Sequence, residues 1–264
     1  MKKLILLVIL LIFGHVVFAA APNEDSSLIN NIGQNILTSN RLPNAEFVIT
    51  STPDLFDDYF VKANLKKKVE LYQGDLSYAK DEGEITAVIA AQVGKISNNM
   101  PTVSQSRGTS SGLVLMDKGH EIMSFKSTKI TSYKRLNKNE VDLAADRTGV
   151  DFLIQNGSNP LAMISLYGRY LDDDKNTATI RIMNVYDYIN YNFPEKLKQD
   201  YPTESYKKAM AVINAQLNSR TEADNQKIRA EQAKINEKKL KQANSSFKGM
   251  NPWNSSYTTL LLHK

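Results

Sequence analysis

The chain has 264 residues, a formal net charge of +5, three histidines and no cysteine. The absence of cysteine excludes disulfides, thiolate metal sites, a cysteine nucleophile and lipid attachment through a cysteine. An apolar share of 42% and a charged share of 23% exclude wholesale disorder, and the length allows one or two domains.

The first 19 residues have the composition of a secretory signal peptide. Lys2 and Lys3 precede an apolar run over residues 4–18, and small residues follow it. This run is shorter than the roughly 20 residues that a membrane-spanning helix needs. We therefore expect an exported protein whose leader is cleaved after Ala19. Cleavage after Ala21, or retention of the leader as an anchor, is the alternative.

Residues 20–202 are expected to form one α/β domain, which is slightly acidic with 20 basic and 23 acidic side chains. The spacing of apolar residues predicts one helix over residues 25–39 and another over residues 84–96. Residues 45–50 and 65–72 are predicted strands, the second of them an edge strand protected by its lysines.

The middle of this domain is predicted to alternate between the two kinds of structure. Residues 113–116 and 121–125 are expected to pair as a short hairpin. Residues 139–147 are a predicted helix that Gly149 closes as its C-cap. Residues 150–155 follow as a predicted strand, because they are short, apolar and end at an Asn-Gly turn.

The clearest alternation in the chain predicts an antiparallel hairpin of residues 163–171 and 177–186. The acidic segment 172–176 between them fits a solvated hairpin turn, since Asp and Asn favour such turns. With the other predicted elements, this hairpin indicates an α/β fold, in which helices pack on a mixed sheet.

Residues 203–248 are predicted to form one long polar and basic helix. They carry 10 basic and 5 acidic side chains and contain neither Gly nor Pro. The helix is expected to project into solvent, or to contact a protein partner, an anionic polymer or a lipid surface. Residues 249–264 form a separate aromatic and leucine-containing tail. A stripe that can dock on the body consists of Tyr206, Met210, Ile213 and Leu217.

Three local patterns resemble catalytic or metal sites, and each lacks part of its required context. Ser110 stands in a G-x-S-x-G string, but a polar loop precedes it and a predicted strand follows it, whereas a nucleophile elbow needs a strand and then a helix. Asp172–Asp174 lacks the later glycine and acidic ligand of a calcium loop. The carboxylate clusters at 54–58 and 81–84 lack an accompanying aromatic groove.

No nucleotide-phosphate motif is present, and an acidic exported domain argues against nucleic-acid binding. We therefore expect no catalytic residue, no cofactor and no metal site.

Aromatic residues are dense at the end of the predicted hairpin, and tyrosine is common at contact surfaces. Cross-strand packing is the alternative explanation for them. The tail helix adds two isoleucines one heptad apart, and the terminal tail adds the only tryptophan. The predicted partner-binding residues are Tyr186, Tyr188, Tyr191, Phe193, Ile228, Ile235, Trp253 and Tyr257.

One run of predicted elements resembles a group of bacterial envelope proteins. It consists of the helix Asn139–Gly149, the strand Val150–Ile154, Gly157 and the hairpin, which ends in Arg181-Ile-Met-Asn-Val185. This order is similar to that of the flagellar outer-membrane FlgO-like proteins and the curli-secretion lipoproteins. The resemblance implies a mixed sheet backed by helices and an assembly role without catalytic residues. Those families are typically anchored through a cysteine, which this chain lacks.

These features together predict an exported, non-catalytic protein of the bacterial envelope, located in the periplasm, secreted, or peripheral to the outer membrane. We expect an assembly or scaffolding component of a flagellar or secretion machine, bound to protein partners. The alternatives are a secreted or periplasmic hydrolase that uses Ser110 or clustered carboxylates, and a periplasmic ligand-binding protein with a cleft in its body.

Export is expected to remove the leader. When the full chain is expressed in a bacterial host, N-terminal sequencing of the exported protein should therefore begin at Ala20. A product that keeps Met1 and sediments with the membranes would contradict cleavage.

Overall fold

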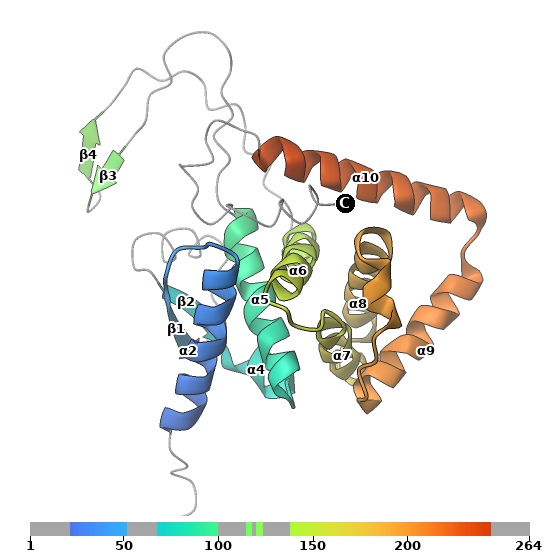
Figure 1. The fold of residues 1–264 in the computed structure, drawn as a ribbon, viewed down its shortest axis with the longest axis horizontal. Helices are drawn as coiled ribbons and strands as arrows, with labels where there is room; N and C mark the ends of the chain where they lie inside the picture. The colour runs from blue at the N-terminus through green and yellow to red at the C-terminus, as the bar shows by residue number, and fades with distance from the viewer. Residues whose placement is uncertain (1–21, 52–67, 100–114, 118–119, 124–137, 244–264) are drawn as a thin grey trace, which may run out of the picture.

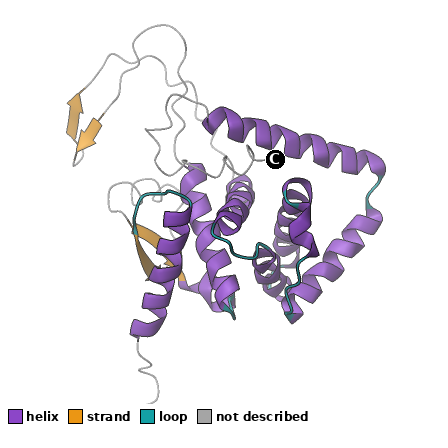
Figure 2. Cartoon of the chain, in the orientation of Figure 1, coloured by secondary structure: helices purple, strands orange, loops and turns teal. Residues whose placement is uncertain are grey.

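The computed structural model describes residues 22–51, 68–99, 115–117, 120–123 and 138–243, and most of these residues are helical (Figure 1). The predicted mixed sheet is wrong, because the described strands form only two separate two-stranded pairs (Figure 2). In chain order the elements are α2 (Pro22–Ser39), β1 (Glu46–Thr50), β2 (Lys68–Tyr72), α4 (Gln73–Tyr78), α5 (Glu82–Asn99), β3 (Leu115–Asp117), β4 (His120–Met123), α6 (Lys138–Gln155), α7 (Leu161–Arg169), η1 (Tyr170–Asp172), α8 (Lys175–Asn192), η2 (Pro194–Lys198), α9 (Glu204–Ser219) and α10 (Glu222–Ala243).

The small parallel sheet of β1 and β2 is closed on both edges by side-chain amides. On the β1 edge, Asn30 of α2 accepts a hydrogen bond from the backbone N–H of Phe47 at 3.1 Å. On the β2 edge, Gln92 of α5 donates to the carbonyl of Glu70 at 2.9 Å. These bonds satisfy backbone groups that would otherwise be open to pairing with another chain. The predicted helix and strands of this region are confirmed.

Helix α5 lies at the centre of the molecule and packs closely along α6 (Figure 1). A Cβ atom on Gly94 of α5 would lie 2.4 Å from the carbonyl oxygen of Ala145 on α6. One on Gly149 of α6 would lie 3.1 Å from the backbone nitrogen of Ala91 on α5. The two backbones therefore touch at glycines from both helices, and a side chain at either position would separate them.

The prediction that Gly149 ends the helix is wrong, because α6 continues through this residue to Gln155. Gly149 instead lies where α6 approaches α5 closely. The predicted strand 150–155 is the last part of this helix, and its apolar side chains are buried in the core. The helix ends at Gln155, and Gly157, two residues later, has a left-handed φ of 78°. The N–H of Ser158 then donates to the carbonyl of Leu153 at 2.8 Å, a common helix terminus.

The predicted antiparallel hairpin 163–171/177–186 is wrong, because both of its segments are helical. Every residue of α7 from 161 to 168 is buried. A helix that is buried on all sides shows no 3.6-residue period, so its sequence also fits a strand. In α8 a helical spacing is present, since its buried apolar residues include Ala178, Ile182, Val185 and Ile189.

The acidic run between α7 and α8 begins a helix and is not a hairpin turn. The side chain of Asp174 caps α8 by accepting a hydrogen bond from the backbone N–H of Thr177 at 3.1 Å. Asp173 accepts from the hydroxyl of Tyr78 at 2.6 Å, and Asp172 pairs with Lys208. Each of the three acids therefore has its own protein partner.

The polar tail folds as two helices, not one. Helix α9 begins where predicted, after Thr203, whose hydroxyl accepts a hydrogen bond from the N–H of Tyr206 at 3.1 Å. The predicted stripe docks on the body, and Tyr206 and Ile213 are buried. A reciprocal cap between Thr221 and Asp224 then starts α10, which lies across one end of the helical body (Figure 1).

Strands β3 and β4 pair antiparallel and overlap the predicted runs 113–116 and 121–125, although each strand extends one residue further toward the turn. The predicted leader, Ser110 and the terminal tail lie outside the described residues. No helix in the described part of the chain combines the length and the apolar character needed to cross a membrane.

Replacing Gly94 by alanine sets two effects against each other. Helix propensity alone predicts that Gly94→Ala stabilises the protein by up to about 1 kcal/mol. The contact with Ala145 predicts the opposite, a loss of about 1–3 kcal/mol in the free energy of unfolding, because the new methyl group pushes the helices apart. Urea denaturation measures the difference, and a higher midpoint for the variant would contradict the close crossing.

Candidate functional site

The predicted partner-binding residues differ in accessibility. Tyr188 and Phe193 are buried in the core, which corrects the expectation that they form part of a contact surface. Tyr191 is 38% exposed. Trp253 and Tyr257 lie outside the described residues. The half-buried members of the set are Tyr186, Ile228 and Ile235.

Tyr191 and Ile228 line one surface hollow, which we call the α8–α10 crevice. It lies between α8, the end of α9 and the first turns of α10. The structure thus brings together two predicted residues from distant parts of the chain. The other residues that line the crevice are Asp187, Asn190, Leu217, Arg220, Asn225 and Arg229.

A two-point ion pair fixes the wall of this crevice. The Nη1 and Nη2 atoms of Arg220 donate to the two carboxylate oxygens of Asp187 at 2.6 and 2.7 Å. Both side chains are largely buried, at 15% and 11% exposure. The pair joins α8 to the turn between α9 and α10, and its planar geometry holds that turn in one orientation.

A buried ion pair holds α10 against the body. Lys239 of α10 donates to the carboxylate of Asp151 on α6 and, at 2.5 Å, to the hydroxyl of Tyr188 on α8. Tyr188 in turn donates to Asp151 at 2.7 Å. Burial raises the pKa of the Asp151 carboxyl and lowers the pKa of the Lys239 ammonium, because both charged forms lose hydration. Their mutual attraction opposes both shifts.

The inner stripe of α10 also carries polar side chains, beside the half-buried Ile228 and Ile235. Gln232, Asn236 and Lys239 follow helical spacing, and Asn236 donates to the side chain of Asn192 at 2.7 Å. The side-chain oxygens of Gln232 and Asn236 are buried and accept no hydrogen bond from the described residues. Because such oxygens lose hydration without gaining a donor, the contact depends strongly on Lys239.

Two of the three carboxylates at 81–84, those of Asp81 and Glu84, are occupied by structural bonds. Glu84 is fully buried and accepts hydrogen bonds from Ser165 and from Arg169, both at 2.7 Å. Asp81 accepts from the hydroxyl of Tyr201 at 2.5 Å. Within the described residues, no group of three or more His, Asp or Glu side chains is arranged to hold a metal ion. The second carboxylate cluster, at 54–58, lies outside the described residues.

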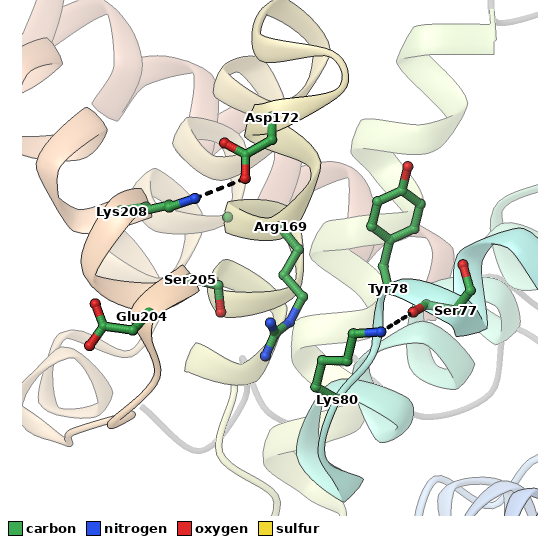
Figure 3. Close-up of a pocket in the computed structure, with 9 residues that line it drawn as sticks. Ser77, Tyr78, Lys80, Arg169, Asp172, Glu204, Ser205 and Lys208 are labelled. Carbon is green, nitrogen blue, oxygen red and sulfur yellow. Dashed lines mark hydrogen bonds and ion pairs between the residues drawn. The ribbon is translucent and has the colours of Figure 1, made fainter.

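A second hollow, which we call the Arg169 groove, opens between α4, α7 and the start of α9 (Figure 3). Arg169 extends into it between Ser205 and Lys80. The groove has a volume of about 370 Å³. Its lining residues are Ser77, Tyr78, Lys80, Gly168, Arg169, Asp172, Glu204, Ser205 and Lys208.

Sequence reasoning missed both Arg169 and Lys239. Ser165 and Arg169 are four residues apart and share a helix face toward Glu84, but the strand prediction for this segment hid that relation. Lys239 follows Lys238 in a uniformly polar helix, and no sequence signal distinguishes the buried lysine from the exposed one.

No protein-family model, curated protein or solved structure matches this chain.

Removing the buried lysine is expected to release α10. Lys239→Met leaves Asp151 buried without its cation, a state that costs about 3–5 kcal/mol unless water reaches the carboxylate. Release of α10 is the simplest relief, so amide hydrogen exchange over residues 222–238 should become much faster. Lys238→Met is the matched control, because its side chain is exposed.

The double variant Lys239→Met with Asp151→Asn removes both charges and should recover most of the lost protection. Equal exchange rates in Lys239→Met and Lys238→Met would show that the ion pair does not hold α10.

Proposed function

We propose that this chain is an exported, non-catalytic protein of the bacterial envelope that binds a protein partner through the α8–α10 crevice. The observation that carries the proposal is the meeting of Tyr191, Leu217 and Ile228 beside the Arg220–Asp187 pair. Aromatic and arginine side chains around an apolar patch are characteristic of protein contact sites. The predicted leader supports export.

The charge on α10 supports a protein partner over an anionic polymer or a lipid surface. Among the residues of α10 whose exposure the structure gives, four exposed cations accompany four exposed carboxylates, so their exposed charges cancel. Mixed charge of this kind matches a partner with its own mixed surface. The exposed charged residues of α10 are Glu222, Asp224, Lys227, Arg229, Glu231, Lys234, Glu237 and Lys238.

The ion pairs at the two ends of α10 support a binding role in a different way. Arg220–Asp187 and Lys239–Asp151 hold α8, α9 and α10 in place without a partner. A preformed surface loses less conformational entropy on binding than a surface that must first become ordered.

The proposed envelope role rests on the leader and the crevice. The segments that carry the resemblance to FlgO-like and curli-secretion proteins are the helices α6, α7 and α8 in this structure. We nevertheless propose an assembly or scaffolding role, since a rigid non-catalytic body with a contact crevice is suited to joining other proteins.

Site-specific photo-cross-linking in the native cell tests the proposal. A photoreactive residue placed at Tyr191 should give a discrete adduct of higher mass in the envelope fraction. The matched control is Ile180, which is on the same helix and 55% exposed but does not line the crevice. Monomer alone from position 191, or the same adducts from both positions, would contradict a partner site at the crevice.

A further inference from the structure

We propose that the Arg169 groove binds a small ligand through a carboxylate group. The groove shares no lining residue with the α8–α10 crevice, so this site is independent of the proposed protein contact. Its volume of about 370 Å³ is within the range of small-molecule sites. Two cations that line the groove, Arg169 and Lys80, have N–H groups that can bind an anion.

The guanidinium of Arg169 is held from one side only. Its Nε atom donates to Glu84 at 2.7 Å, and no described residue accepts a hydrogen bond from its two Nη atoms. The side chain is 25% exposed and extends into the groove (Figure 3). Two parallel N–H groups on a fixed plane match the two oxygens of a carboxylate.

Glu84 acts here as a positioning residue. Its two oxygens accept hydrogen bonds from the Ser165 hydroxyl, from the backbone N–H of Lys80 and from Arg169, each at 2.7 Å. The carboxylate is fully buried, so no water would replace these donors if it moved away from them. Arg169 is thus fixed in orientation before any ligand enters.

The need to neutralise Glu84 explains why Arg169 carries a positive charge, but it does not explain the second cation, Lys80. The Lys80 ammonium donates to the carbonyl of Ser77 at 2.7 Å, and no described carboxylate pairs with it. Lys80 lies on the opposite side of Arg169 from Ser205 (Figure 3). The groove therefore has a second cation that can contact an anion bound to Arg169.

The remaining lining residues favour a monoanion over a phosphate dianion. Asp172 and Glu204 bring two carboxylates to the rim, although each is paired with a lysine, and they repel multiply charged anions. The ring of Tyr78, stacked at 4.0 Å on Tyr170, provides a flat apolar surface for the rest of the ligand. A carboxylate attached to a small flat or apolar body fits both features.

An NMR titration of the mature protein with acetate and benzoate tests the site, with phosphate and chloride at equal ionic strength as comparisons. Benzoate should shift the Arg169 side-chain Nε–H and the amides around Lys80 and Ser205, at lower concentration than acetate does. Lys80→Gln should weaken benzoate binding about tenfold, because one hydrogen bond to a charged group is lost. Lys175→Gln, on an exposed part of α8, is the matched control.

Arg169→Lys keeps a cation beside Glu84 but removes the paired N–H groups, and it should abolish the benzoate shifts while the protein stays folded. If Arg169→Lys does not fold, Lys80→Gln still tests the site, because Lys80 is exposed and its replacement leaves the core unchanged. Equal shifts with chloride, or unchanged affinity in Lys80→Gln, would overturn the site. Tighter binding of phosphate than of benzoate would overturn the assignment to carboxylates.

Discussion

The helical part of this protein depends on the neutralisation of three fully buried carboxylates. Glu84, Asp146 and Asp151 are excluded from solvent, and a buried carboxylate is strongly unfavourable unless a cation and hydrogen-bond donors accompany it. Each is matched by a cation from a helix further along the chain, which ties α5 to α7, α6 to α8 and α6 to α10. The pairs are Glu84–Arg169, Asp146–Arg181 and Asp151–Lys239.

The same requirement explains two buried tyrosines, Tyr167 and the predicted contact residue Tyr188. Tyr167 donates to Asp146 at 2.5 Å and Tyr188 donates to Asp151 at 2.7 Å, so both rings are buried with their hydroxyls on acids. Arg181 also lies over the ring of Tyr167, at 4.2 Å from its centre. Much of the aromatic density near residues 167–188 therefore serves the core, and of the predicted contacts in α8 only Tyr191 is well exposed.

Both candidate sites are consequences of this arrangement. Glu84 orients Arg169, whose outer side then faces the Arg169 groove. Asp151 holds the far end of α10, and Asp187 holds the turn at its start, so that Ile228 and Tyr191 meet across the crevice. Burial of charge thus stabilises the fold and also positions the exposed residues that can contact other molecules.

The sequence by itself determined the elements with one buried and one solvated face, since these carry a clear period. It located α2, β1, β2 and the start and docking stripe of α9 in this way, together with Tyr191 and Ile228. It also located α5, whose larger apolar residues keep helical spacing although residues 86–94 are all buried. Only the tertiary structure decided that α7 and the end of α6 are helical, because surrounding helices bury them and remove the period. It alone decided which cations meet which buried acids, because such pairs join residues that are distant in the chain and leave no local signal.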